Sequence, residues 1–129
     1  MKFKFFILII SFCLINNLNC FSQVRLKTPE FKKLLTTAKN YQLIDVRTPT
    51  ELKEGIIKNS YNIDYYSETF EKQIKNLDTN KMTFVYCSCG GRSEEAIKLM
   101  NQWGFKSVFE LEDGYNDWVK SGYETVKKK

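Results

Sequence analysis

The sequence predicts an α/β domain built on a mainly parallel sheet, with helices covering both faces. Short runs rich in β-branched and aromatic residues alternate with segments of helical periodicity along most of the chain. Because parallel strands need crossover connections, this alternation indicates βαβ units. The chain has 129 residues, of which 43% are hydrophobic, so it is long enough for one such domain with its own core. No internal repeat or Pro/Gly-rich linker divides it.

Five segments are predicted as strands. Residues 82–86 are apolar apart from one threonine, which is typical of a central strand buried on both faces. The other four strands are expected at residues 23–27, 41–46, 61–63 and 107–111.

Helices are predicted between these strands from capping residues and from the spacing of apolar residues. Thr28 is expected to cap the first helix, with Pro29 at its first position. A short helix is expected at residues 48–55, where Arg47 and Glu51 are spaced to brace its start as an ion pair. Two further helices are expected at residues 70–77 and 114–120. The helix that follows the segment 87–93 is expected to carry Ala96, Ile97, Met100 and Trp103 and to stop at Gly104.

The first 22 residues differ in composition from the rest. Lys2 and Lys4 precede an uncharged apolar run at residues 5–15, which is shorter than the roughly 20 residues that span a membrane. Cys20 and Ser22 then stand at the small positions of a signal-peptide cleavage site. We therefore expect a signal peptide over residues 1–22, a folded domain over residues 23–129, export to the periplasm, and no stable membrane insertion after cleavage. The alternatives are lipid attachment through Cys20, an uncleaved anchor and a buried N-terminal helix.

Charge and residue usage exclude several classes of function. The net charge of +5 is dispersed, without a basic stripe interleaved with aromatics, so nucleic acid is not an expected partner. The chain has no histidine, which excludes Ser-His-Asp triads, Cys-His dyads and zinc sites with histidine ligands. Of its four cysteines, only Cys87 and Cys89 lie in the predicted domain, so cysteine chemistry is expected there.

The segment after strand 82–86 is the candidate site. Cys87 lies at the junction of this strand with the next helix, where unpaired backbone amides and the helix dipole favour a thiolate. Gly90 and Gly91 allow the amides to turn inward, and Arg92 adds positive charge. A persulfide on Cys87 would be stabilised in the same way. Cys87 is therefore the predicted nucleophile, and the predicted binding loop consists of Ser88, Cys89, Gly90, Gly91, Arg92 and Ser93.

Two further charged residues are expected to support this site. Asp45 and Arg47 follow a buried strand, and such pairs more often brace loops than react. Arg92 is also expected to orient the loop through a carboxylate.

These residues resemble the rhodanese (sulfurtransferase) family over residues 24–126. The resemblance lies in three segments, Leu43-Ile44-Asp45-Val46-Arg47 with Glu51 and Gly55, Phe84-Val85-Tyr86-Cys87 with Gly90, Arg92 and Ser93, and Leu111-Glu112-Asp113-Gly114-Tyr115 with Trp118 and Gly122. It implies a rhodanese-like fold of the single-domain exported type, with a parallel five-stranded sheet flanked by helices on both faces. It also implies that no metal or organic cofactor is needed.

The resemblance further implies a reaction. Cys87 would take a sulfane sulfur from thiosulfate, a polysulfide or a persulfide and hold it as a persulfide. It would then pass the sulfur to a thiophilic acceptor, such as cyanide, a small thiol or a protein thiol.

Two other functions stay open from the residues. Cys87 and Cys89 could form a disulfide, which would make the chain a thiol–disulfide redox protein. The domain could also be a non-catalytic binding module of the rhodanese type. A metal site on the two thiolates lacks two further ligands, so none is predicted.

Overall fold

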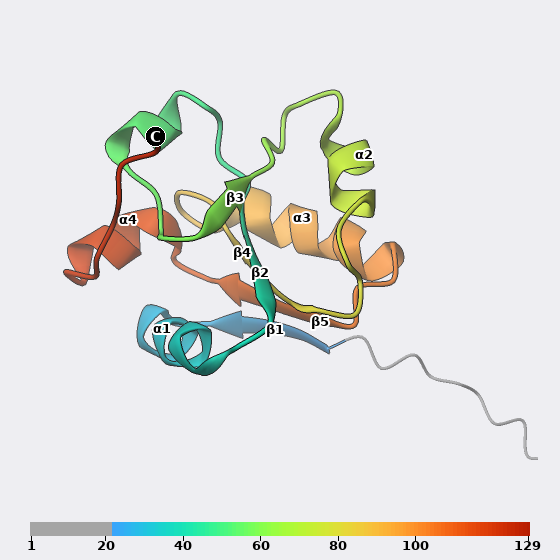
Figure 1. The fold of residues 1–129 in the computed structure, drawn as a ribbon, viewed down its shortest axis with the longest axis horizontal. Helices are drawn as coiled ribbons and strands as arrows, with labels where there is room; N and C mark the ends of the chain where they lie inside the picture. Colours follow the sequence, from blue (N-terminus) through green and yellow to red (C-terminus); the bar gives the residue numbers. More distant parts are fainter. Residues whose placement is uncertain (1–21) are drawn as a thin grey trace, which may run out of the picture.

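A five-stranded parallel sheet forms the centre of the protein in the computed structural model, which describes residues 22–129 (Figure 1). The strands run in the order β1-β5-β4-β2-β3, and each neighbouring pair is parallel. They are β1 (Ser22–Leu26), β2 (Tyr41–Asp45), β3 (Ser60–Asn62), β4 (Met82–Tyr86) and β5 (Ser107–Leu111). The predicted fold class is confirmed. The predicted signal peptide, with Cys20, lies outside the described residues apart from Ser22.

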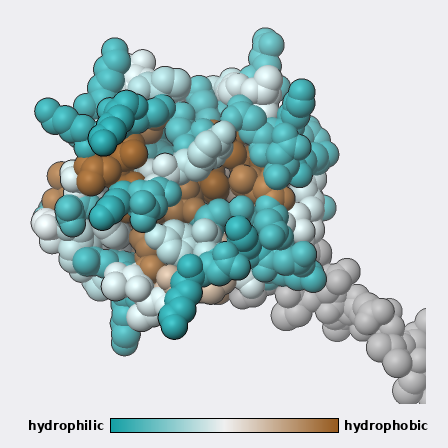
Figure 2. All heavy atoms as spheres, in the orientation of Figure 1, coloured by the Kyte–Doolittle hydropathy of each residue, from teal (hydrophilic) through white to brown (hydrophobic). Residues whose placement is uncertain are grey.

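Helices cover both faces of the sheet (Figure 1). They are α1 (Thr28–Thr37), α2 (Phe70–Lys75), α3 (Gly91–Gln102) and α4 (Gly114–Lys120), together with the 3-10 helix η1 (Glu51–Glu54). Between residues 22 and 129, no helix has the length and apolar character needed to cross a membrane. In the view of Figure 2, hydrophilic residues cover most of the surface and hydrophobic residues show mainly in the recesses between them.

The two faces of the sheet carry separate cores. On one face, Ile74 of α2 and Ile97 of α3 pack with Val85 and Cys87. On the other face, Phe31 of α1 and Trp118 of α4 belong to the cluster that contains Phe84 and Tyr86. Because successive side chains of a strand point to opposite faces, β4 contributes to both cores and sends Cys87 toward α3.

Thr28 does not cap α1, contrary to the prediction. Lys27 holds the extended N-cap conformation, with φ −65° and ψ 157°, so the helix begins at Thr28 and Pro29 follows inside its first turn. The Thr28 hydroxyl donates instead to the carboxylate of Asp117 in α4. Thr28 is fully buried, so this hydrogen bond is an internal link between α1 and α4.

The short helix expected at residues 48–55 is only the single 3-10 turn of η1. Its hydrogen bonds span three residues, as in the 3.1 Å bond from the Gly55 amide to the Leu52 carbonyl. Gly55 ends the turn at φ +123°, where a Cβ would lie 2.7 Å from the Tyr115 hydroxyl oxygen. A side chain here would therefore overlap the Tyr115 hydroxyl of α4.

Replacement of Thr28 by valine tests the link between α1 and α4. We expect Thr28→Val to lower the free energy of unfolding by about 1 kcal/mol, because it removes a partly buried hydrogen bond and keeps the side-chain shape. Thr36→Val is the matched control, since the exposed Thr36 hydroxyl bonds only to the Lys32 carbonyl of its own helix. Urea unfolding of both variants measures the difference, and equal losses would contradict the assignment.

Candidate active site

Cys87 lies at the carboxyl edge of the sheet, between the end of β4 and the start of α3. Its side chain is buried, and its Sγ accepts a 3.0 Å hydrogen bond from the Gly90 amide. The Ser93 hydroxyl lies 3.4 Å from the same sulfur. The first amides of α3 have no acceptor within the helix and stand at the positive end of its dipole. The surroundings of Cys87 therefore suit a sulfur anion.

Gly90 gives the loop its curvature. Its φ of +98° is a conformation that other residues rarely adopt, and a Cβ would lie 2.0 Å from the Glu112 carbonyl oxygen. Gly91, the second glycine of the predicted loop, has an ordinary φ as the first residue of α3, and no neighbour lies within 4 Å of the position of a Cβ. Only the first of the two glycines is therefore required by the geometry.

The start of α4 holds the other side of the loop. The Tyr115 amide donates to the Cys87 carbonyl at 2.8 Å, and the Asn116 amide donates to the Ser88 carbonyl at 3.0 Å. A Cβ on Gly114 would lie 2.3 Å from the Ser88 oxygen, so glycine permits this close approach. The Cys87–Ser88 backbone is thus clamped by α4 while the Cys87 side chain faces α3.

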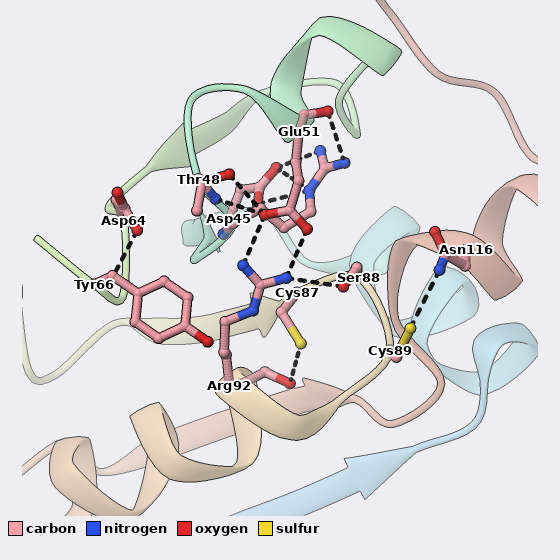
Figure 3. Close-up of polar contacts among 12 residues, drawn as sticks. Asp45, Thr48, Glu51, Asp64, Tyr66, Cys87, Ser88, Cys89, Arg92 and Asn116 are labelled. Carbon is pink, nitrogen blue, oxygen red and sulfur yellow. Dashed lines mark hydrogen bonds and ion pairs between the residues drawn. The ribbon is translucent and has the colours of Figure 1, made fainter.

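Cys89 points away from Cys87. Its side chain is exposed, and its Sγ accepts a 3.2 Å hydrogen bond from the side-chain amide of Asn116 in α4. Figure 3 shows the Cys87 sulfur directed toward α3 and the Cys89 sulfur directed toward Asn116. Both thiols are free. The structure therefore places the two cysteines in one loop without bringing their sulfur atoms together.

Arg92 is bound to Glu51 (Figure 3). The two side chains form two parallel hydrogen bonds of 2.7 Å each, and Arg92 also donates to the Ser88 hydroxyl at 2.9 Å. The expected pair between Arg47 and Glu51 is wrong, because Arg47 reaches only the Glu51 backbone carbonyl. Arg92 thus fixes Ser88 in the loop, and its positive charge is shared with a carboxylate.

Glu51 is held as an anion. The hydrogen bonds from Arg92 lower its pKa to about 2, although partial burial opposes this shift. The amide and hydroxyl of Thr48 donate to the same carboxylate at 2.9 Å each. The spacing of threonine and glutamate three residues apart is that of a capping box, which is the signal in the sequence for part of this arrangement.

Asp45 and Arg47 pair with each other. Arg47 donates to Asp45 Oδ2 at 2.7 Å and to the Gly55 carbonyl at 2.8 Å, and its guanidinium lies 3.9 Å from the centre of the Tyr115 ring. Burial alone would lower the pKa of Arg47, but the hydrogen bond and charge of Asp45 raise it overall. This buried pair joins the end of β2 to the end of η1 and to α4, which is a bracing role.

A buried carboxyl group that the sequence reasoning missed lies behind the loop. Glu110 of β5 is fully buried, accepts a 2.9 Å hydrogen bond from the Ser93 hydroxyl, and accepts a 2.8 Å hydrogen bond from Arg25 Nε. Burial raises its pKa, while the bonds from Ser93 and Arg25 oppose the shift. An acidic residue flanked by apolar ones inside a predicted strand was the available signal. Within residues 22–129, no three His, Cys, Asp or Glu side chains gather closely enough to hold a metal ion.

The fold and the cysteine loop together define a rhodanese-type domain. The sequence profile described as Rhodanese-like domain matches residues 27–121, so the chain belongs to this family. A rhodanese-related protein from Thermoplasma volcanium has a similar structure, with a TM-score of 0.72 and 28% sequence identity over 81% of this chain and 99% of that one.

Relatives in this family carry different names. The thiosulfate:glutathione sulfurtransferase of Saccharomyces cerevisiae is 34% identical over 64% of this chain and 68% of its own length. The tRNA uridine(34) hydroxylase of Pelagibacter ubique is 31% identical over 74% of this chain, but the match spans only 31% of that protein. Since several relatives are named as sulfurtransferases, the chain belongs to a family associated with sulfur transfer.

The two loop glycines give a matched pair of variants. We expect Gly90→Ala to lower the free energy of unfolding by about 2 kcal/mol or more, because alanine at this φ is strained and its Cβ overlaps the Glu112 carbonyl. Gly91→Ala meets no neighbour and should change stability by only a few tenths of a kcal/mol. Chemical unfolding of the two variants measures the difference in their free energies of unfolding. Similar values for the two would show that the loop does not need Gly90.

The pair of Glu51 and Arg92 should make stability depend on acid. The folded-state pKa of Glu51 lies below its ordinary value of 4.5. The contribution of this ion pair to the free energy of unfolding is therefore complete above about pH 4.5 and is lost as the pH falls to about 2. We expect Glu51→Gln to cost about 2 kcal/mol near neutral pH and nothing once Glu51 is protonated.

Unfolding measured from pH 7 down to about pH 2 checks this dependence. Glu71→Gln is the control, because the Glu71–Lys75 pair is exposed and such pairs contribute little. A Glu51→Gln loss that stays constant down to the lowest pH would contradict the assigned ionisation.

Proposed function

We propose that this protein is a sulfurtransferase in which Cys87 carries a sulfane sulfur as a persulfide. The observation that carries the proposal is the setting of the Cys87 sulfur, with the Gly90 amide at 3.0 Å and the start of α3 beside it. Hydrogen-bond donors and a helix N-terminus stabilise a sulfur anion in both the thiolate and the persulfide form. The sulfurtransferase names among the relatives support the same class of reaction.

The reaction needs two displacements. In the first, the Cys87 thiolate attacks the outer sulfur of the donor, so a bond forms between the two sulfurs and the donor fragment leaves with the electron pair of its broken bond. In the second, an acceptor nucleophile attacks the outer sulfur of the Cys87 persulfide, and Cys87 leaves as a thiolate. Neither step needs a histidine, and neither changes the net oxidation state of the pair of reactants.

The charges of the loop favour a persulfide donor over thiosulfate. Thiosulfate carries two negative charges, whereas the guanidinium of Arg92 is already bound through two hydrogen bonds to Glu51. Ser88, the residue after the nucleophile, is neutral and accepts a hydrogen bond from Arg92. A donor with a single charge needs less compensation at this site.

The acceptor is a thiol, small or protein-borne, that approaches beside Tyr66. This tyrosine is 68% exposed, and the Arg92 guanidinium carbon lies 5.7 Å from the centre of its ring (Figure 3). An exposed aromatic ring next to the reactive loop offers a contact for an approaching acceptor. We also propose that the protein works after export, on the composition of residues 1–22.

Intact-mass spectrometry tests the transfer. The purified chain is incubated in turn with a low-molecular-weight persulfide, inorganic polysulfide and thiosulfate. We expect the mass of one sulfur atom to be added on Cys87, fastest with the persulfide. The addition should be absent in Cys87→Ser and should be removed by a thiol acceptor.

Cys89→Ser separates this proposal from the redox function. If sulfur transfer proceeds through Cys87 alone, the variant still loads sulfur and still releases it to the acceptor. Failure to load sulfur from any donor, together with rapid formation of a Cys87–Cys89 disulfide in the unsubstituted chain, would instead favour a thiol–disulfide redox protein.

A further inference from the structure

A continuous line of polar groups connects the Cys87 sulfur to a buried carboxyl group. Cys87 Sγ lies 3.4 Å from Ser93 Oγ, and Ser93 Oγ lies 2.9 Å from Glu110 Oε1. All three residues are buried. In a chain without histidine, Glu110 is therefore an acidic group joined to the candidate nucleophile by two hydrogen bonds.

The sheet register explains why these residues meet. Val85 of β4 and Arg25 of β1 lie on either side of Glu110 in β5. Because side chains alternate along a strand, Cys87 projects from the same face as Val85, two residues further along β4. Ser93 comes down onto this face from the first turn of α3. A carboxyl group in this row, instead of another apolar side chain, must have its charge compensated.

The number of hydrogens in this line restricts its ionisation. Ser93 has one hydroxyl hydrogen. When Ser93 donates it to a Glu110 carboxylate, Cys87 must donate to Ser93 and is therefore a thiol. When Ser93 donates it to a Cys87 thiolate, Glu110 must donate to Ser93 and is therefore a carboxylic acid. Both arrangements keep both hydrogen bonds and hold one negative charge, whereas two buried negative charges joined by one hydroxyl would repel each other.

We propose that Cys87 and Glu110 share one proton through Ser93, so that Glu110 receives the thiol proton when Cys87 becomes the attacking thiolate. The proton of the thiol passes to Ser93 Oγ as the hydroxyl proton of Ser93 passes to Glu110 Oε1. Bonds to hydrogen are exchanged, and no electron is gained or lost. Glu110 does not touch the substrate, so it is a positioning residue for a proton.

The surrounding charges can stabilise either arrangement. Glu110 meets Arg25 from β1 directly and Glu94 of α3 at longer range, where Glu94 lies 3.8 Å from Arg25. At the other end, the Gly90 amide donates to Cys87, and the Arg92 charge interacts with it. Burial raises the pKa of Glu110, which makes the carboxyl group a better proton acceptor than an exposed glutamate. One negative charge can therefore reside at either end of the line.

The shared proton closes the proposed reaction cycle, and this part of the inference rests on the proposed function. The proton stays on Glu110 while the Cys87 thiolate takes the outer sulfur of a persulfide donor and the donor thiolate leaves. When the acceptor thiolate removes that sulfur, Cys87 is released as a thiolate and recovers the proton from Glu110 through Ser93. No proton has to enter from solvent during either displacement.

Carbon-13 NMR of the full chain tests the sharing from both ends. The Cβ shift of Cys87 and the carboxyl shift of Glu110 are followed from about pH 4 to pH 11, a range that spans ordinary Glu and Cys titration. Two groups that share a proton titrate together in two steps. We expect each carbon to show two inflections in the unsubstituted protein.

Removing either partner should leave a single inflection at the other. Glu110→Gln should reduce the Cys87 titration to one step, and Cys87→Ser should reduce the Glu110 titration to one step. These two variants keep the proposal testable if one fails to fold. Ser93→Ala should give one step for each group, since it removes the hydroxyl that joins them. Glu94→Gln is the matched control, because it removes another carboxylate beside Arg25 and should leave both two-step titrations in place.

Identical Cys87 titration curves in the unsubstituted protein and in Glu110→Gln would overturn the shared proton. A one-step Glu110 titration that is unchanged in Cys87→Ser would also overturn it. Sulfur loading, measured on the same preparations, separates this outcome from the proposed function. Two-step titration without loading would leave the shared proton standing and reject sulfur transfer. Sulfur loading with one-step titrations would support sulfur transfer and reject the shared proton.

Discussion

Two backbone hydrogen bonds from α4 to the cysteine loop determine how the site is built. The carbonyls of Cys87 and Ser88 accept the Tyr115 and Asn116 amides, so both oxygens of this segment turn toward α4. The Cys87 side chain is consequently left on the side of α3, among donors that favour a sulfur anion. This approach is possible only because Gly114 has no Cβ. The contact between α4 and the loop that follows β4 thus orients the nucleophile.

Three arginines neutralise the carboxylates that surround this edge of the sheet. The pairs are Asp45 with Arg47, Glu51 with Arg92, and Glu110 with Arg25. The second and third pairs join residues that are distant in the sequence. In the first pair the two residues are close in the sequence, but Arg47 also donates to the Gly55 carbonyl. Because each of these arginines already has a carboxylate partner, the proposed sulfur anion is compensated mainly by the amide beside Cys87. The proposed sulfur anion therefore depends on backbone amides and on the proton shared with Glu110 more than on an unpaired cation.

Local patterns were enough to predict the strands, the sheet type and the cysteine loop. The apolar run of β4 and the glycine after α3 are signals within a few residues, and the structure has β4 at Met82–Tyr86 as expected. The partners of the charged residues were not predictable in this way. Spacing arguments reach only three or four residues along a helix, which is why they pair Glu51 with Arg47 instead of Arg92.

The partners that the structure shows are distant in the sequence. Glu51 and Arg92 are 41 residues apart, and Arg25 and Glu110 are 85 residues apart. Their meeting depends on the strand order β1-β5-β4-β2-β3, which no local pattern encodes. The prediction that Thr28 caps α1 is wrong for a similar reason. Its hydroxyl donates to Asp117, which lies in α4, far away in the sequence. The contacts of Glu110 likewise depend on the position of β5 between β1 and β4, which brings Arg25 and Ser93 to the same carboxyl group.

The position of β1 at the edge of the sheet has a consequence for how the protein assembles. Its only strand neighbour among residues 22–129 is β5, so β1 cannot pair until Ser107–Leu111 has been synthesised. Such distant pairings slow folding, because the loop must close before the contact stabilises it. Arg25 belongs to β1, so the positive charge that pairs with Glu110 reaches it only when β1 pairs with β5. An intermediate with four paired strands would already have the cysteine loop and still lack the cation behind it.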